Sequence, residues 1–183
     1  MDKVCVFLTT GFEEIEALTA VDLLRRAGID TEMVSITGEL DVEGSHGISV
    51  KTDKLFENID FNEVTMLVLP GGAGTKHLEA HTALMHQIEA FYKEGKNIAA
   101  ICAAPSILGH RGMLKGKNAC SYPDYESHLE GANVTQNAAE ISDNIITGRG
   151  MGCSVDFGLA IVKKLRGEEA AQMLSEKIIY GHY

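Results

Sequence analysis

The chain has 183 residues and a formal net charge of −10, because 26 Asp and Glu outnumber 16 Lys and Arg. No stretch rich in Lys or Arg interrupts this acidic background, which argues against a nucleic-acid binder that works by neutralising phosphates. Apolar residues make up 45% of the chain and charged residues 23%, as in a folded globular protein rather than a disordered one. The length fits one domain with a single core.

Neither a membrane span nor an export signal is predicted. The longest uncharged apolar run, residues 98–109, is far shorter than the ~20 residues that a transmembrane helix needs, and the apolar stretch at the N-terminus is too short for a signal peptide. We therefore expect a cytoplasmic protein with reduced thiols at Cys5, Cys102, Cys120 and Cys153. These cysteines form no CxxC pair, and no Cys/His group has zinc-ligand spacing, so neither a metal nor a cofactor is expected.

Short apolar runs alternate with segments of helical periodicity along the chain. Strands are predicted at residues 3–9, 31–36, 48–52, 65–69, 97–101 and 118–121, with a loop over 37–47 and a hairpin through 140–147. Helices are predicted at 13–27, 83–93, from 104 onward, 155–165 and 168–177. Strands that alternate with helices indicate βαβ units. We therefore predict one doubly wound α/β domain over residues 1–183, with a mainly parallel sheet and helices on both faces.

The junction after the strand at 97–101 is the most informative part of the chain. In doubly wound folds, sites form beyond the carboxyl ends of the strands, and Cys102 stands at that point. Ala100 and Ala104, two residues before and after it, are both small, as the sharp turn of a nucleophile elbow requires. Pro105 suits the first turn of the helix that follows. We predict a functional Cys102, against the alternative that it is a small core residue.

Two side chains are predicted to have shifted pKa values. A helix N-terminus next to Cys102 would lower the pKa of the thiol, because free N–H groups and the helix dipole favour the thiolate. Dipole compensation on a solvated turn is enough to explain Glu13 and Glu14 at the start of the first helix. Glu16 lies further into that helix, and its pKa would be raised if its carboxyl pointed into the site.

A second turn, Gly71–Gly74, follows the buried strand at 65–69. Its backbone N–H groups could bind an oxyanion, or its glycines could serve a tight turn that needs positive φ angles. The sequence leaves both alternatives open. A third glycine-containing turn, Gly148–Gly152, lacks the GK[ST] ending of a phosphate loop, so nucleotide binding is not predicted.

Five segments, in order and at matching spacing, resemble the ThiJ/PfpI superfamily, in particular the branch of the parkinsonism-associated protein deglycase and its bacterial relatives. They are GFEEIE at 11–16, VDLLRRAG at 21–28, LPGG at 69–72, AAICAAP at 99–105, and RGMG at 149–152 followed by LAIV at 159–162. The resemblance covers nearly the whole chain. It implies a flavodoxin-like fold, similar to that of the class I glutamine amidotransferases, and a homodimer.

The resemblance also implies roles for individual residues. Cys102 matches the oxidisable nucleophile of the family, and Glu16 matches the carboxyl that stays protonated against the sulfur. The backbone N–H groups of Gly72 and Ala103 match the oxyanion pocket. Gly71 and Tyr122 are expected to line the same site.

Two positions depart from the family pattern. Many members carry a histidine just before the proline of the turn after the elbow, where this chain has Tyr122 before Pro123. A tyrosine cannot act as a general base at neutral pH, although its hydroxyl can hold a hydrogen bond. The case for a Cys–His–acid catalytic triad is therefore weakened. His46 stands where relatives often have arginine. It either lines the mouth of the site or lies in a surface loop.

The resemblance implies a cysteine-dependent, stress-protective enzyme that acts on a small α-oxoaldehyde or a glycated substrate, as a glutathione-independent glyoxalase or protein deglycase. Cys102 would be the nucleophile and Glu16 the proton carrier. The alternative is a redox-responsive chaperone or oxidative-stress sensor, in which Cys102 oxidises to the sulfinic acid. Peptidase or amidotransferase activity ranks third, because of Tyr122 and because no His-x-Glu follows the elbow. No nucleic-acid or membrane partner is expected.

Overall fold

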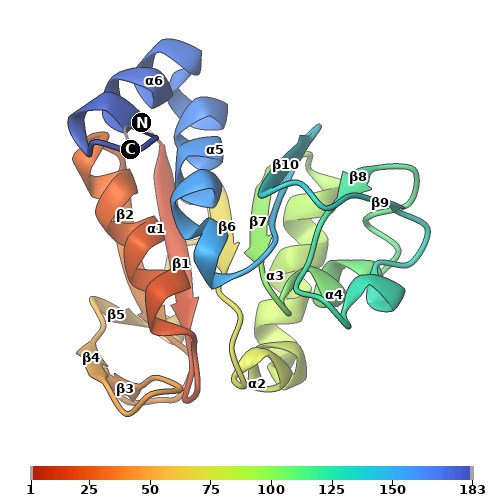
Figure 1. The fold of residues 1–183 in the computed structure, drawn as a ribbon. Helices are drawn as coiled ribbons and strands as arrows, with labels where there is room; N and C mark the ends of the chain where they lie inside the picture. Colours follow the sequence, from red (N-terminus) through yellow and green to blue (C-terminus); the bar gives the residue numbers. More distant parts are fainter. Residues whose placement is uncertain (1, 182–183) are drawn as a thin grey trace.

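In the computed structural model, which describes residues 2–181, one seven-stranded sheet forms the centre of the molecule (Figure 1). Its spatial order is β10-β11-β7-β6-β1-β2-β5, and neighbouring strands are parallel except for the antiparallel pair β10–β11. The strands are β1 (Lys3–Leu8), β2 (Asp30–Ser35), β5 (Lys54–Leu55), β6 (Met66–Leu69), β7 (Asn97–Ile101), β10 (Ala139–Ser142) and β11 (Ile145–Gly148). The predicted mainly parallel sheet is confirmed, and the hairpin through 140–147 is the pair β10–β11.

Helices cover both faces of the sheet (Figure 1). The side chains of β1 show how, because Val4, Val6 and Leu8 pack on one side and Cys5 and Phe7 on the other. The first side is covered by α1 (Glu14–Arg26), α5 (Ser154–Arg166) and α6 (Glu168–Lys177), and the second by α2 (Thr75–Ala80), α3 (Thr82–Lys93) and α4 (Pro105–Gly109). A strand buried on both faces needs a continuous apolar run, which is the pattern that its sequence shows. The doubly wound, flavodoxin-like fold class is therefore confirmed.

The smaller elements depart most from the prediction. The segment expected to be a loop over 37–47 contains β3 (Asp41–Glu43), which pairs antiparallel with β4 (Ser49–Lys51). The strand expected at 118–121 is only β8 (Asn118–Ala119), which pairs with β9 (Asn133–Val134), and the helix α2 was not predicted. Short 3-10 turns complete the chain: η1 (Phe56–Asn58), η2 (Glu126–His128) and η3 (Met151–Cys153). Each of these elements is too short for a periodic pattern to be recognised.

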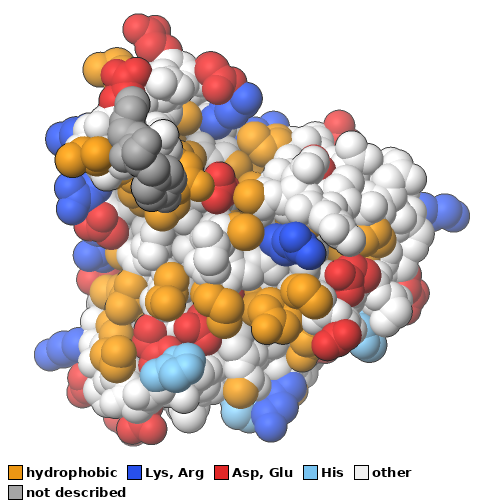
Figure 2. Space-filling view, viewed as in Figure 1, with side chains coloured by type: hydrophobic (Ala, Val, Ile, Leu, Met, Phe, Trp, Pro, Cys, Tyr) orange, Lys and Arg blue, Asp and Glu red, His pale blue; other side chains and the backbone are white. Residues whose placement is uncertain are grey.

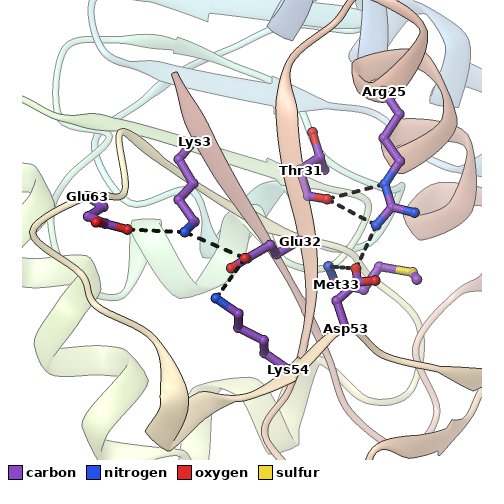
Figure 3. Close-up of polar contacts among 8 residues, drawn as sticks. All are labelled: Lys3, Arg25, Thr31, Glu32, Met33, Asp53, Lys54 and Glu63. Atoms are coloured by element: carbon purple, nitrogen blue, oxygen red, sulfur yellow. Dashed lines mark hydrogen bonds and ion pairs between the residues drawn. The ribbon is translucent and has the colours of Figure 1, made fainter. Parts of the chain in front are cut away.

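Charged side chains tie together the β2–β5 edge of the sheet (Figure 3). The carboxylate of Glu32 lies 3.5 Å from Lys3 Nζ and 2.8 Å from Lys54 Nζ. Asp53 Oδ2 accepts a hydrogen bond of 2.6 Å from Arg25 of α1. These contacts bind the edge strand β5 to its neighbours, and charges along an edge also oppose pairing with another sheet.

Figure 2 shows a row of hydrophobic side chains across one face of the molecule, next to a histidine and acidic side chains. The large hydrophobic residues with exposed surface include Ile15, Ile48, Tyr122 and Met151. No helix within residues 2–181 combines the length and the apolar character that crossing a membrane requires.

Candidate functional site

Cys102 lies on a strained turn between β7 and α4. Its φ angle is +66°, in the left-handed region that residues other than glycine rarely adopt, and its neighbours Ala100 and Ala104 are fully buried. The N–H of Cys102 donates to the carbonyl of Gly148, and its own carbonyl accepts from the N–H of Tyr122, both at 2.9 Å. The predicted elbow is therefore present, and hydrogen bonds to the end of β11 and to Tyr122 hold it in place.

Gly71 and Gly72 bring the loop after β6 against this elbow. A Cβ atom on Gly71 would lie 2.6 Å from Cys102 Cβ and 2.7 Å from Glu16 Oε2, so there is room only for glycine between the two side chains. Gly72 has a φ angle of +89°, and a Cβ there would lie 2.6 Å from the backbone nitrogen of Glu13. Gly71 thus allows a close approach of the backbone to Cys102 and Glu16, and Gly72 supplies the positive φ angle of the turn. The N–H of Gly72 faces the sulfur of Cys102 and lowers the pKa of its thiol in part.

Glu16 is completely buried beside Cys102, although it comes from α1 on another part of the chain. Its Oε2 accepts a hydrogen bond of 2.8 Å from the N–H of Gly71. Its Oε1 is buried without a hydrogen-bond partner among the described residues. Burial raises the pKa of Glu16 to about 7, although the Cys102 thiol and the N–H of Gly71 lower it in part. The predicted rise in the pKa of this carboxyl is confirmed.

The pKa of the Cys102 thiol moves in the direction opposite to the prediction. Burial, followed by the charge and hydrogen bonding of Glu16, raises it to about 12, and the N–H groups of Gly72 and Ala103 lower it only in part. The prediction relied on the dipole of the next helix. That helix, α4, has five residues and begins at Pro105, three residues beyond the sulfur. The prediction of a low-pKa thiol was wrong, because burial and a carboxylate neighbour outweigh so short a helix.

Cys102 and Glu16 consequently titrate as a pair. An ionised Glu16 opposes formation of the thiolate, and a protonated Glu16 removes that opposition and leaves the two N–H donors on the sulfur. The thiolate is therefore less disfavoured when the carboxyl holds the proton, although burial still raises the pKa of the thiol. The pair can attack with sulfur and move a proton with the carboxyl at one point in the site.

Tyr122 contacts the site through its backbone. Its N–H donates to the carbonyl of Cys102, as described above, and its ring lies against Gly150, where a Cβ would be 3.1 Å from Tyr122 Cδ2. The side chain is 40% exposed. Its role as a lining residue stays a prediction.

His46 pairs with the two glutamates that precede Glu16. Its Nδ1 lies 2.9 Å from Glu14 Oε2 and 3.8 Å from Glu13 Oε1, and its backbone N–H donates to Glu14 Oε1 at 2.7 Å. The imidazole is 66% exposed, but both carboxylates are buried. The explanation of Glu13 and Glu14 as residues on a solvated turn was therefore wrong, because the loop between β3 and β4 covers them. Within residues 2–181, these three residues are the one group of metal-ligating side chains whose ligand atoms converge, all within 4.8 Å.

In a comparison with protein families, the chain matches the DJ-1/PfpI family over residues 2–164. The chain belongs to the DJ-1/PfpI family. The resemblance to the ThiJ/PfpI superfamily is thereby confirmed. Among solved structures, the oxidized DJ-1 of Toxoplasma gondii superposes with a TM-score of 0.93 at 30% identity, over the full length of both chains.

Similar curated members of the DJ-1/PfpI family differ in length and in name. DJ-1 homolog B of Arabidopsis thaliana is 32% identical over 97% of this chain, but the chain spans only 41% of that protein. A deglycase of Pyrococcus horikoshii is 31% identical over 74% of this chain and 82% of its own length. A Bacillus subtilis relative with a provisional cysteine-protease name is 32% identical, over 80% and 88% respectively. Family membership thus supports enzymatic activity without fixing the reaction.

The other cysteines of this DJ-1/PfpI chain have different surroundings. Cys5 and Cys120 are fully buried, and burial raises their pKa values to about 12 and about 11. Cys153 is half-buried. Among the described residues, none of these three thiols has both a carboxyl and two N–H donors acting on its sulfur. This difference sets Cys102 apart.

Sequence reasoning missed the contacts of Glu13 and Glu14, since their partner His46 lies 32 residues further along the chain from Glu14. The only available signal was the adjacent acidic pair itself, which is equally typical of an exposed first turn. His110 and His128 hydrogen-bond to each other at 2.9 Å, and His110 also pairs with Glu79 at 2.8 Å, so these histidines are engaged outside the Cys102 site.

Proposed function

We propose that this protein is a cysteine-dependent, stress-protective enzyme for α-oxoaldehydes or their adducts, acting as a glutathione-independent glyoxalase or protein deglycase. The observation that carries the proposal is the position of the Cys102 sulfur, between the Glu16 carboxyl and the N–H groups of Gly72 and Ala103. Addition to an aldehyde needs a nucleophile, a proton carrier and donors for a developing oxyanion. The deglycase name of the Pyrococcus relative supports the same class of chemistry.

With methylglyoxal as the substrate, the reaction begins with a bond between the Cys102 sulfur and the aldehyde carbon. The thiol proton reaches the aldehyde oxygen through Glu16, and the product is a hemithioacetal. The N–H groups of Gly72 and Ala103 are the donors available to the oxygen while it carries negative charge. This step uses the raised pKa of Glu16, because a carboxyl that holds a proton near neutral pH can give it up to the substrate.

The second half of the reaction moves hydrogen between adjacent carbons. Glu16 removes the proton from the sulfur-bearing carbon and returns it to the neighbouring carbonyl carbon, while the hydroxyl proton moves from the first oxygen to the oxygen of that carbonyl. The product is the thioester of a hydroxy acid. Water hydrolyses this thioester, releases the hydroxy acid and restores the thiol. One substrate carbon is oxidised and its neighbour reduced, so no external oxidant or reductant is needed.

Replacement of Cys102 by alanine tests this proposal, and Cys153→Ala is the matched control because Cys153 is also a free thiol with exposed surface. We expect Cys102→Ala to consume methylglyoxal at least about 100-fold more slowly, since covalent and acid–base catalysis are lost together. Cys153→Ala should stay within about twofold of wild type. The measurement follows lactate formation by chromatography. Lactate production by Cys102→Ala at the wild-type rate would end the proposal.

A second candidate function uses the same sulfur as a redox sensor or as the switch of a chaperone. The Toxoplasma relative is described in an oxidized form, and the N–H donors and a protonated Glu16 could hold the oxygens of a sulfinic acid on Cys102. Intact mass after mild peroxide treatment separates the two functions. Two oxygen atoms confined to Cys102, in a protein without aldehyde turnover, would favour sensing, and oxidation spread over other residues would count against it.

We also propose that the protein is a cytoplasmic homodimer. Ile15, Ile48 and Met151 are between 37% and 53% exposed and border one cavity, and clustered apolar side chains of this kind mark protein contacts. Peptidase or amidotransferase activity remains the third candidate. The groups recorded around the Cys102 thiol in residues 2–181 are a carboxyl and backbone N–H groups, without the histidine that a triad needs.

A further inference from the structure

Two buried carboxylates meet one exposed imidazole at the start of α1. The side chains of Glu13 and Glu14 are each 7% exposed, and His46 of the β3–β4 loop covers them. Across all the described residues, His46 is the one cationic side chain within 4 Å of either carboxylate. A protonated imidazole balances at most one of the two negative charges. Two adjacent buried carboxylates therefore leave a charge that this part of the protein does not balance.

Glu13 is the carboxylate without a partner of its own. Both oxygens of Glu14 are engaged, by the backbone N–H of His46 at 2.7 Å and by its Nδ1 at 2.9 Å. The side chain of Glu13 accepts no hydrogen bond from residues 2–181, and its nearest cationic atom is His46 Nδ1 at 3.8 Å. A buried carboxylate with neither a donor nor a close ion pair is costly in a folded protein. This carboxylate points to a cation that binds between it and His46.

The ligand atoms are already close to the spacing that a metal ion requires. In a tetrahedral zinc site, oxygen and nitrogen ligands lie ~2.1 Å from the ion and therefore ~3.4 Å from each other. The distances from His46 Nδ1 to Glu14 Oε2 and Glu13 Oε1, 2.9 Å and 3.8 Å, lie on either side of that value. A cavity of about 340 Å³ adjoins the three side chains and leaves room for water at a fourth position.

The backbone around the cluster is fixed independently of the imidazole. The N–H of Ser45 donates to the carbonyl of Phe12 at 2.8 Å, and Gly44 lies so close that a Cβ would be 2.4 Å from Glu14 Oε1. The loop is thus pressed against the start of α1, which places His46 next to both carboxylates. Pre-positioned ligands of this kind reduce the cost of binding.

We propose that Glu13, Glu14 and His46 bind one divalent first-row transition-metal ion, for which Zn²⁺ is the test ion. Two carboxylate oxygens and one imidazole nitrogen suit such an ion. The site adjoins the loop after β6, because the N–H of Glu13 donates to the carbonyl of Gly71 at 3.1 Å. A bound ion would therefore tie the β3–β4 loop and α1 to the turn that carries Gly71 and Gly72.

Zinc titration of the metal-free full chain by calorimetry tests the site. We expect one Zn²⁺ per chain, and a loss of affinity of at least about tenfold in both Glu13→Gln and His46→Gln. His46→Gln is the safer variant for folding because the imidazole is exposed. His110→Gln is the matched control, since His110 also faces a carboxylate, Glu79, at 2.8 Å, and it should bind Zn²⁺ like wild type.

Thiols also bind zinc, so the same titration is repeated with Co²⁺ and followed by visible absorption. The proposed ligands contain no sulfur, and the spectrum should show d–d bands without a sulfur-to-cobalt charge-transfer band. No binding by the wild type, binding with unchanged affinity in both Glu13→Gln and His46→Gln, or a sulfur charge-transfer band would overturn the proposal. None of these readouts depends on aldehyde turnover, so this proposal can fail while the proposed enzyme activity stands.

Discussion

Glu14 and Glu16 lie two residues apart in the first turn of α1, and their pKa values move in opposite directions. Both are buried, and burial is the largest cause acting on each carboxyl and raises its pKa. For Glu14, hydrogen bonds from the side chain and backbone of His46 outweigh burial, and its pKa falls below the usual value. For Glu16, the donors are a thiol and one N–H, and its pKa remains near 7.

Burial acts on both carboxylates, and the difference between them shows that the strength of the hydrogen-bond donors decides whether burial is outweighed. Residues two apart on an α-helix point ~200° away from each other around its axis. Glu14 therefore meets the β3–β4 loop while Glu16 meets the elbow at Cys102. Glu14 stays ionised and holds the β3–β4 loop against α1, and Glu16 is suited to holding and releasing a proton.

The largest expected effect contrasts these two positions directly. Glu16→Gln removes the proton carrier and keeps the size of the side chain, so methylglyoxal turnover should fall at least about 100-fold, as is typical for loss of general acid–base catalysis. Glu14→Gln should retain activity within about tenfold, because its contacts are with the loop. Initial rates of both variants, measured at equal concentrations of folded protein, check this expectation. Equal losses at the two positions would contradict the division of roles.

A second way to test the comparison is to force the carboxyl and the sulfur apart. Gly71→Ala introduces a Cβ 2.6 Å from Cys102 Cβ and 2.7 Å from Glu16 Oε2, so we expect a loss of about 1–3 kcal/mol in the free energy of unfolding from overpacking. Gly152→Ala is the control, because its Cβ would meet no atom within 4 Å, and it should change stability by less than about 0.5 kcal/mol. Urea unfolding measures both. Equal stability of the two variants would mean that Gly71 is not the tight spacer described here.

The sheet and its main helices could be predicted because their signals are local. The apolar run of β1 and the periodic face of α1 each lie within one segment, and burial on both sides of the sheet follows from them. The strand β3 has one buried apolar residue, Val42, between two exposed acids, Asp41 and Glu43, and therefore carries no such signal. Its pairing with β4 depends on a partner strand rather than on its own sequence.

The features of the site also divide into those with a local sequence signal and those that depend on distant residues. The position of Cys102 and the small residues around it are properties of one strand and one turn, so the elbow could be predicted. The direction of its thiol pKa could not, because Glu16 arrives from α1 and is hydrogen-bonded to Gly71, 55 residues away. A helix dipole can be read from a sequence, but the carboxylate and the burial that outweigh it depend on the tertiary fold.

The prediction with the smallest expected effect tests whether hydrogen-bond donors also outweigh burial for a carboxyl outside α1. Glu79 of α2 is about one-third exposed, and its Oε1 accepts hydrogen bonds from His110 at 2.8 Å and from Arg111 at 3.2 Å. Burial raises the pKa of Glu79, but His110 and Arg111 outweigh burial and lower it overall. A carboxyl whose pKa is lower in the folded state stabilises the protein above its unfolded pKa and loses that contribution as the pH falls through the folded pKa.

Glu79→Gln should therefore destabilise the protein by a few tenths to about 1 kcal/mol at pH 7, as for partly exposed ion pairs, and by less at pH 3.5. The measurement is the difference in unfolding free energy between wild type and variant at the two pH values. Glu89→Gln, whose carboxylate is 3.8 Å from Arg111 Nε, is the control for loss of charge near the same arginine. A Glu79→Gln difference that grows on acidification would have the wrong sign. It would mean that burial governs this carboxyl, as it governs Glu16, in spite of the cationic donors around it.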